Sequence, residues 1–377
     1  MDSKLLWILL GVSVVSALSV MVFSLVESAH AEAPSAETIA TTRTQSAPEP
    51  ESAPARQQAP TGAPDDVPRS DNGVWMRRHW IHGGDEELRV TELASSLDRL
   101  GITRIYPFLG PMDTHGYPGW RKNGDIQRYN PERASRFFND MAEHAPNVRV
   151  MPWTGGVLAR DVRLTDRTQR RKFAAHARKL TELGADGIHI NVEPMPSGEP
   201  GYIELLESTK EAMGPDKTLS IAAYPPKTAM HPFPDVHWSL EFTREVCMAA
   251  DELAFMGYDT ALRDKTSYVE LMATWTEDLL ETLPAPKDGG CEVLIGVPAY
   301  EDDRGYHRPR IENIATGLEG VKRGLDRLED VPDHFRGVAI YASWVTDEEE
   351  LRTYQRAWRG LDGTDNRVLP DYAGADQ

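Results

Sequence analysis

Cysteine is scarce in this sequence, with only 2 Cys among 377 residues. Cys247 and Cys291 lack CxxC spacing, which excludes a cysteine-based zinc site and a thioredoxin-type redox motif. Both precede predicted neighbouring strands at one end of the fold, so a disulfide between them is geometrically allowed in an exported protein. Because unpaired cysteines are commonly buried like small apolar side chains, two free thiols are the favoured interpretation.

Clustered basic residues are also missing. The net charge is −18, the acidic residues are spread along the chain, and no group of Lys and Arg is interleaved with aromatic residues. Since phosphate binding needs a basic surface, the sequence argues against nucleic acid as a partner. No Gly-rich turn follows the first predicted strand, which argues against a dinucleotide-binding fold, and no repeat period indicates a solenoid.

The N-terminal 31 residues contain the longest apolar run. Residues 5–26 carry no charged side chain and are long enough to span a bilayer. Ala29-His30-Ala31 then fits the small-x-small pattern of a signal-peptide cleavage site. An uncleaved membrane anchor and a removed signal peptide therefore both fit residues 1–31. Either one exports the rest of the chain, to a periplasmic, cell-surface or extracellular location.

The next segment, residues 32–70, is rich in Pro, Ala, Ser and Glu and nearly free of large apolar residues. Such a segment cannot bury enough apolar surface to offset the entropy lost on ordering, so we expect a disordered linker. A folded domain is predicted over residues 71–362, followed by a C-terminal tail over 363–377.

Short apolar runs alternate with amphipathic helical patterns through this domain. The helical patterns include residues 86–101, 168–184 and 312–329, and several end near a glycine, as helices often do. Eight alternations favour an α/β fold, a (β/α)8 TIM barrel, over a doubly wound sheet. The eight predicted strands are 73–80, 102–110, 148–156, 186–194, 219–225, 252–259, 293–300 and 337–344.

The fourth predicted strand, DGIHINVEP, alternates apolar and polar side chains. In a barrel, one face of a strand packs outward on helices and the other points into the interior. The outward set would be Ile188, Ile190 and Val192, and the inward set His189, Asn191 and Glu193. Because an unpaired buried polar group costs about 1–3 kcal/mol, three inward polar groups in succession indicate a functional site.

This stretch resembles the fourth-strand signature of family 18 glycoside hydrolases, Asp-Gly-x-Asp-x-Asp-x-Glu. Its Asn-x-Glu ending is similar to the matching strand of family 85 endo-β-N-acetylglucosaminidases. Other strands resemble family 18 in the same order: PWTGG at 152–156 for Ser-x-Gly-Gly, MGYD at 256–259 for Met-x-Tyr-Asp, IGVPAY at 295–300, and Trp344 for the strand-eight Trp. The resemblance covers most of the predicted domain.

The resemblance implies substrate-assisted cleavage with retention, in which the acetamido oxygen of the sugar attacks the anomeric carbon. Glu193 would be the general acid and base, Asn191 would bind the acetamide nitrogen, and Tyr258 would bind its carbonyl oxygen, with Asp259 beside it. Asn191 replaces an Asp and cannot carry negative charge, which implies a neutral oxazoline or imidic-acid route. His189 replaces a supporting Asp.

Sugar sites also need flat aromatic surfaces against which pyranose rings stack. Trp344 is the predicted stacking residue. Trp153, Tyr300 and Trp75 fall at or near predicted strand ends, where stacking on a sugar and ordinary packing both remain open. Together with His189 and Asp259, these four aromatic residues form the predicted substrate-binding set.

A second hypothesis is a metal-dependent hydrolase, suggested by His79 and His82 in RRHWIH. A spacing of three would place the two imidazoles on opposite faces of a strand, and the fifth and eighth predicted strands end in Tyr224 and Trp344, without a His or Asp ligand. We therefore predict neither a metal ion nor an organic cofactor.

A third hypothesis is a glycan-binding protein that keeps the barrel and has lost catalysis. His189 and Asn191 suggest it, whereas the retained Glu193 and Tyr258 argue against it. Taken singly, Glu193 would be an exposed carboxylate at a strand end, and His189 or Tyr258 an ordinary core residue. Their joint placement favours a glycoside hydrolase whose partner is an oligosaccharide or polysaccharide with β-linked N-acetylhexosamine.

Overall fold

The computed structural model describes residues 71–83, 89–113, 115–122, 124–233, 236–365 and 367–370. The predicted anchor or signal peptide at 1–31, the predicted linker at 32–70 and the last residues of the predicted tail lie outside these ranges. Within them, no helix combines the length and the apolarity needed to cross a membrane.

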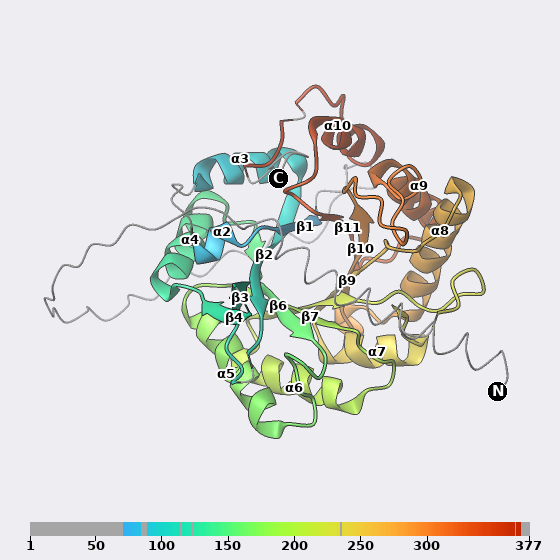
Figure 1. Cartoon of the computed structure of the whole chain (residues 1–377). Helices are drawn as coiled ribbons and strands as arrows, with labels where there is room; N and C mark the ends of the chain where they lie inside the picture. Colours follow the sequence, from blue (N-terminus) through green and yellow to red (C-terminus); the bar gives the residue numbers. More distant parts are fainter. Residues whose placement is uncertain are drawn as a thin grey trace, which may run out of the picture.

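Eight parallel strands close into a barrel (Figure 1). Strand β1 pairs in parallel with both β2 and β11, which joins the first strand to the last. The predicted (β/α)8 architecture is therefore confirmed. The barrel strands are β1 (Asn72–Met76), β2 (Ile102–Pro111), β6 (Trp153–Val157), β7 (Gly187–Glu193), β8 (Thr218–Ala223), β9 (Glu252–Phe255), β10 (Glu292–Pro298) and β11 (Phe335–Tyr341).

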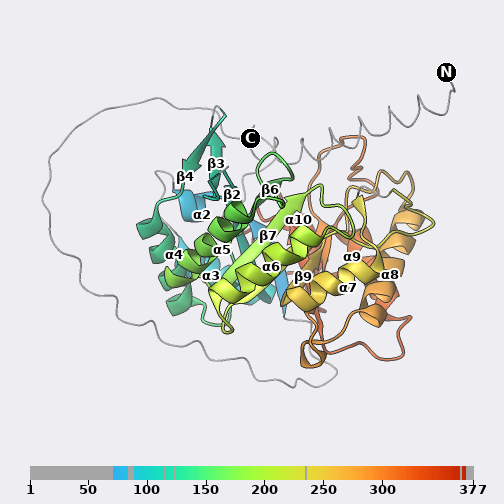
Figure 2. The same cartoon turned by 90° about the horizontal axis from the view of Figure 1, so that it is seen from below.

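Helices surround the strands as an outer ring (Figure 1). Most begin at a side chain that accepts hydrogen bonds from the free backbone N–H groups of the first turn, such as Asn130, Asp166 or Asp264. The helices are α2 (His79–His82), α3 (Val90–Leu100), α4 (Pro131–His144), α5 (Arg167–Glu182), α6 (Pro200–Met213), α7 (Leu240–Ala249), α8 (Lys265–Thr282), α9 (Ile314–Leu325) and α10 (Glu348–Ala357), with a 3-10 turn at η2 (Pro286–Asp288). An antiparallel hairpin of β3 (Gly119–Lys122) and β4 (Asp125–Arg128) projects from the barrel in the connection after β2 (Figure 2).

The first strand is shorter than predicted. It ends at Met76, and residues 79–80, which were expected to belong to it, lie in the single turn of α2. Trp80 on that turn is buried against Phe137 of α4, which favours the helical turn over a longer strand. His79 and His82 therefore lie on a helix and not on a strand, and the Nε2 of His82 faces the Leu109 carbonyl oxygen at 2.7 Å.

The bounds of all the other strands differ by at least one residue from those predicted, and in three of them the difference bears on the site. The third predicted strand is divided into β5 (Arg149–Val150) and β6 at Pro152, which has no N–H to donate to a neighbouring strand. The sixth and eighth strands end at Phe255 and Tyr341 instead of at 259 and 344. The predicted site residues of these two strands consequently lie in the loops beyond the carboxyl ends, where barrel enzymes place their active sites.

The outward face of β7 packs as predicted. Ile188, Ile190 and Val192 are buried in the large core between strands and helices. A second, smaller cluster, which combines large aromatic residues with alanines, fills the barrel interior, so the interior is a packed core. This inner cluster contains Trp75, Tyr106, Phe108, Met151, Trp153, Val157, Ala254, Leu294, Ala339 and Ala342.

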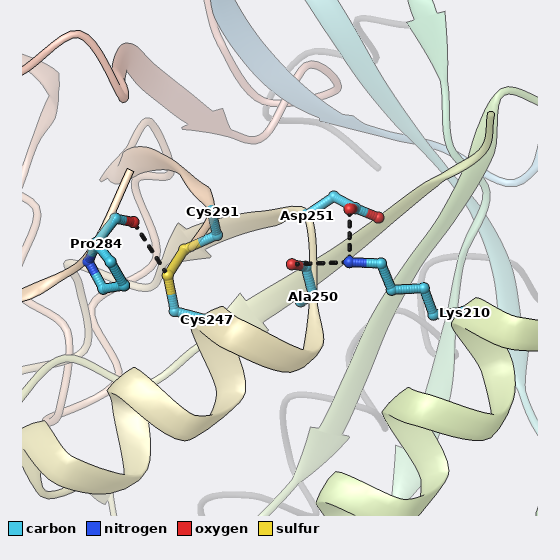
Figure 3. The surroundings of a disulfide bond; sticks show 6 residues. All are labelled: Lys210, Cys247, Ala250, Asp251, Pro284 and Cys291. Atoms are coloured by element: carbon cyan, nitrogen blue, oxygen red, sulfur yellow. Dashed lines mark hydrogen bonds and ion pairs between the residues drawn. A yellow bond between two sulfur atoms is a disulfide. The ribbon is translucent and has the colours of Figure 1, made fainter. Parts of the chain in front are cut away.

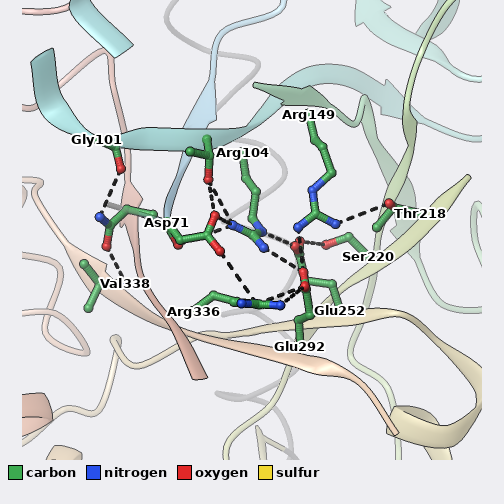
Figure 4. A network of polar contacts seen from close by, with 12 residues as sticks. Asp71, Gly101, Arg104, Arg149, Thr218, Ser220, Glu252, Glu292, Arg336 and Val338 are labelled. Carbon is green, nitrogen blue, oxygen red and sulfur yellow. Dashed lines mark hydrogen bonds and ion pairs between the residues drawn. The ribbon is translucent and has the colours of Figure 1, made fainter. Parts of the chain in front are cut away.

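A network of charged side chains closes the amino end of the barrel: Asp71, Arg104, Arg149, Glu252, Glu292 and Arg336 (Figure 4). Arg104 is fully buried and contacts the carboxylates of Asp71, Glu252 and Glu292. Burial raises the pKa of Glu292, but the surrounding guanidinium groups outweigh it and hold that pKa well below its usual range. Each buried charge is thus paired, as a buried charge must be to be tolerated.

Cys247 and Cys291 form a disulfide (Figure 3), so the interpretation as free thiols is wrong. Cys247 lies in the last turn of α7, and Cys291 directly precedes β10. Both positions fall at the amino end of the barrel, where the helix returns to the strands, and their Cα atoms are 5.2 Å apart. A disulfide is typical of oxidising compartments, in keeping with the predicted export.

The disulfide leads to a stability prediction. The Cys247→Ala, Cys291→Ala double variant should lose about 2–4 kcal/mol of unfolding free energy, because the bond joins residues 44 positions apart and limits the unfolded chain. Urea unfolding with and without dithiothreitol measures the loss. Reductant should destabilise the wild type to the same level and leave the double variant unchanged. Free thiols titrating in the denatured, unreduced wild type would contradict the assignment.

Candidate functional site

The three polar residues on the inward face of β7 are all buried. His189, Asn191 and Glu193 are 0%, 4% and 7% exposed. The Nε1 of Trp75 on β1 donates to the Nε2 of His189 at 3.1 Å. Since β1 and β7 are not neighbours in the sheet, this hydrogen bond crosses the barrel interior and confirms the predicted inward orientation.

His189 connects the site to the charged network below it. Because its Nε2 accepts a hydrogen bond from Trp75, its proton resides on Nδ1, which donates to the Ser220 hydroxyl at 2.8 Å. Ser220 donates to Glu252 at 2.7 Å, and Tyr106, stacked on the His189 ring at 4.1 Å, donates to the same carboxylate. Burial lowers the pKa of His189 to about 3, so the ring is neutral at physiological pH.

Glu193 is the last residue of β7 and has an unusual acidity. Burial raises its pKa to about 7, a hydrogen bond from Asn191 opposes that rise, and the negative charge of Asp259 adds to it. Near neutral pH, both protonation states of Glu193 are therefore well populated. A carboxyl group with these properties can donate a proton in one step and accept one in the next.

Asn191 presents a buried atom without a partner. Its Oδ1 accepts no hydrogen bond from any described residue, although a buried carboxamide oxygen normally accepts one or two. Gly155 of β6 lies directly opposite, with φ of +148°, and a Cβ there would lie 1.8 Å from the Asn191 carbonyl oxygen. The Gly155 position in PWTGG thus permits the close approach of β6 to the site strand.

Tyr258 and Asp259 follow β9 and reach the same end of the barrel. The Tyr258 ring stacks on Tyr341 at a centroid distance of 5.0 Å and meets Trp75 edge-on at 6.5 Å. Its hydroxyl makes no hydrogen bond to the described part of the chain, so it can donate to a ligand. Asp259 has a φ of +62°, an uncommon conformation for a residue with a side chain, and accepts a hydrogen bond from Tyr300.

Two residues of the loop after β10, Tyr300 and His307, contact Asp259. The His307 ring stacks on Tyr300 at 3.8 Å, and its Nε2 donates to the Tyr300 carbonyl oxygen at 3.0 Å. Burial lowers the pKa of His307, but Asp259 and Glu312 outweigh it and raise that pKa to about 9. Glu312 in turn accepts hydrogen bonds from the hydroxyl and the N–H of Thr260, which fixes the loop that carries Asp259.

The predicted aromatic residues divide into two levels. Trp75 and Trp153 are 0% and 2% exposed and lie within the interior cluster. Tyr300 and Trp344 are partly exposed at the carboxyl end, so their rings have surface left for a ligand. The substrate-binding roles of these four residues remain predictions.

Tyr341 is the central aromatic residue and was not predicted. Its ring contacts all four of those aromatic residues and Tyr258, at centroid distances from 5.0 to 6.4 Å. The signal for it was present: Ala339 and Tyr341 alternate with Val338 and Ile340, which places Tyr341 on the inward face. Ser220 and Glu252, two polar residues within apolar runs, were not predicted either, although the same alternation could have indicated them.

No protein-family model and no curated protein matches this chain. Solved structures do resemble it. The spore cortex-lytic enzyme SleL of Bacillus cereus is 11% identical, with a TM-score of 0.50 and coverage of 78% of this chain and 76% of that one. A class V chitinase from Pseudomonas fluorescens Pf-5 is 12% identical, with a TM-score of 0.50 and coverage of 77% and 99%.

A fungal endo-β-N-acetylglucosaminidase from glycosyl hydrolase family 18 is similar to the same degree. It is 12% identical, with a TM-score of 0.51 and coverage of 76% of this chain and 95% of that chain. At such identities, the likeness establishes a shared barrel fold. Only the last of the three is described as a family 18 protein, and the predicted likeness to family 85 is not shown by these structures.

The buried Glu193 predicts a specific dependence of stability on pH. Its pKa is raised from 4.5 to about 7 in the folded state, so folding favours the protonated form. The part of the unfolding free energy that comes from protonated Glu193 is fully present below about pH 4.5 and is lost as the pH rises through 7. Relative to wild type, Glu193→Gln should therefore gain up to about 3 kcal/mol of unfolding free energy between pH 4 and pH 8.

Urea unfolding of both proteins at pH 4, 6 and 8 measures this difference. The matched control is Glu207→Gln, which changes an exposed glutamate on α6. The control should follow the wild type at every pH. A Glu193→Gln curve that runs parallel to the wild-type curve would show that Glu193 titrates normally.

Proposed function

We propose that this protein is a glycoside hydrolase that cleaves β-linked glycans containing N-acetylhexosamine, by a substrate-assisted mechanism with retention. The observation that carries the proposal is the arrangement at the end of β7. There a buried Glu193 with a pKa of about 7 lies beside an Asn191 whose buried Oδ1 has no partner among the described residues.

The comparisons support the substrate class. The structural neighbours named above include a cortex-lytic enzyme, a chitinase and an endo-β-N-acetylglucosaminidase. The strand-four, strand-six and strand-seven motifs of this sequence resemble family 18 at the corresponding strands. The disulfide agrees with an exported enzyme that meets its polysaccharide outside the cytoplasm.

An acetamido group fits the unused polar atoms of the site. Its N–H would donate to the Oδ1 of Asn191, and its carbonyl oxygen would accept a hydrogen bond from the Tyr258 hydroxyl. Together the two contacts would hold the acetamide oxygen below the anomeric carbon, and such positioning accounts for much of the rate in intramolecular attack. The partly exposed rings of Trp344 and Tyr300 would support the sugar.

In the first step, protonated Glu193 would donate its proton to the glycosidic oxygen. The bond from that oxygen to C1 breaks as the acetamide oxygen forms its own bond to C1. Because Asn191 is neutral, it cannot balance a positive charge on the resulting ring. The acetamide nitrogen would therefore pass its proton to the Oδ1 of Asn191, whose Nδ2 releases one to water in exchange. This leaves a neutral oxazoline on the sugar and the imidic-acid form of Asn191.

In the second step, the Glu193 carboxylate would accept a proton from water as the water oxygen attacks C1. The bond from C1 to the acetamide oxygen breaks, the nitrogen recovers its proton from the Oδ1 of Asn191, and the Nδ2 of Asn191 takes one back from water. The product keeps the original anomeric configuration. One carboxyl group acts in both steps, for which a pKa near 7 is suited.

His189 would act as a positioning residue. Both of its ring nitrogens are engaged by Trp75 and Ser220, so it has no nitrogen left for a sugar. It instead fixes the inward face of β7 two residues before Asn191. The supporting Asp of the resembled signature is thus replaced by a neutral group that both accepts and donates.

The direct test is hydrolysis of N-acetylglucosamine oligosaccharides and peptidoglycan fragments, with the product anomer followed by NMR. Wild type should release the β-anomer first, and Glu193→Gln should lose at least about 10³-fold in turnover because it cannot exchange the proton. Release of the α-anomer would exclude the substrate-assisted route. Binding without any cleavage by wild type would instead identify a glycan-binding protein.

A second prediction separates Asn191 from ordinary binding residues. Asn191→Ala should lower kcat by about 10²–10³-fold with a much smaller change in KM, because the contact orients the attacking group. Tyr258→Phe should behave similarly, with a smaller loss. Asn139→Ala, outside the site on α4, is the matched control and should retain wild-type kinetics. Unchanged kcat in Asn191→Ala would remove this residue from the mechanism.

A further inference from the structure

A second group of converging side chains lies beside the proposed site and has no role in the steps above. Asp259 comes from the loop after β9, and His307 and Glu312 come from the loop after β10. One ligand-type atom from each lies within 4.8 Å of the other two. The inference below concerns this group alone and does not depend on the protein being a hydrolase.

His307 is oriented as a metal-binding histidine is. Its side chain is fully buried, and its Nε2–H donates to the Tyr300 carbonyl oxygen. A histidine that binds a metal through one nitrogen typically donates its other N–H to a carbonyl or carboxylate. The remaining atom, Nδ1, is buried, has no hydrogen-bond partner among the described residues, and faces two carboxylates.

The separations are those of ligands around a shared ion. Nδ1 of His307 lies 3.5 Å from Oδ1 of Asp259 and 3.6 Å from Oε2 of Glu312. Charge-assisted hydrogen bonds are shorter, at about 2.7–2.9 Å. Two ligands about 2.0–2.1 Å from a tetrahedral zinc ion lie roughly 3.3–3.5 Å apart, close to both observed separations.

The two carboxylates are held in place before any ion arrives. Glu312 is fully buried and accepts from the hydroxyl and N–H of Thr260, and Asp259 accepts from Tyr300. Such supporting hydrogen bonds orient metal ligands and cut the cost of binding. The Asp259 side chain is 25% exposed, which gives an ion a route to the group from solvent.

We infer that Asp259, His307 and Glu312 bind one divalent transition-metal ion, with Zn²⁺ the best match to two carboxylates and one imidazole. A water molecule would complete the tetrahedron on the exposed side of Asp259. The ion would join the loop after β9 to the loop after β10 and fix the backbone next to Tyr258. Its role would therefore be to order the carboxyl end of the barrel.

Calorimetric titration of the metal-stripped full chain with ZnCl₂, without glycan, tests this inference. Wild type should bind one ion per chain, and His307→Gln should bind at least tenfold more weakly. Glutamine can keep the donor to the Tyr300 carbonyl oxygen while removing Nδ1, so the loop is preserved. His115→Ala, which removes an exposed histidine, is the matched control and should bind as wild type does.

Thermal unfolding gives an independent reading of the same variants. Zn²⁺ should raise the Tm of wild type and of His115→Ala, and should leave that of His307→Gln unchanged. If His307→Gln fails to fold, Glu312→Gln replaces it, since its amide oxygen can still accept from Thr260. Absence of Zn²⁺ binding in wild type, or equal affinity in wild type and either ligand variant, would overturn the inference and leave the group as an ion pair. Since no glycan is present, neither result bears on hydrolysis.

Discussion

The site depends on one constraint, that every polar group pointing into a closed barrel must find a partner inside it. Strand β7 places three such groups in succession, and the barrel satisfies them in order from the base upward. His189 accepts a hydrogen bond from Trp75 and donates one to Ser220, and Ser220 in turn donates to Glu252 of the charged network. Along β7 this pairing stops near the carboxyl end, where the Oδ1 of Asn191 has no partner among the described residues.

The acidity of Glu193 follows from the same constraint. The charged network at the base has enough guanidinium groups to keep its carboxylates ionised, and Glu292 has a strongly lowered pKa for this reason. Glu193 is also buried, but its neighbours are the Asn191 amide and the negative charge of Asp259, so burial prevails and its pKa rises to about 7. The pKa values of Glu292 and Glu193 are thus shifted in opposite directions, because Glu292 is paired with cations and Glu193 is not.

Much of the fold and part of the site could be predicted, because a strand imposes a period of two on the sequence. That period assigned the inward and outward faces of β7 correctly. It could not predict contacts between distant segments. The approach of Cys247 to Cys291 depends on how α7 returns to the barrel, and the convergence of His307 on Asp259 depends on two loops without periodicity. Tyr341 was not predicted although its strand carries the pattern, because Trp344 in the same segment matches the strand-eight Trp of family 18.

The two departures from the family 18 signature are physically consistent with each other. An Asp at position 189 would place a carboxylate next to Ser220, whose hydroxyl is already committed to Glu252, and would leave two negative charges close together in a dry interior. A neutral His189 avoids this, since it accepts from Trp75 and donates to Ser220. With no charge at 189, an Asp at 191 would have no supporting acid below it and would stand next to Glu193. Asn191 removes that repulsion as well. The inward face of β7 therefore carries a single carboxyl group, that of Glu193, at the position where the proposed chemistry needs one.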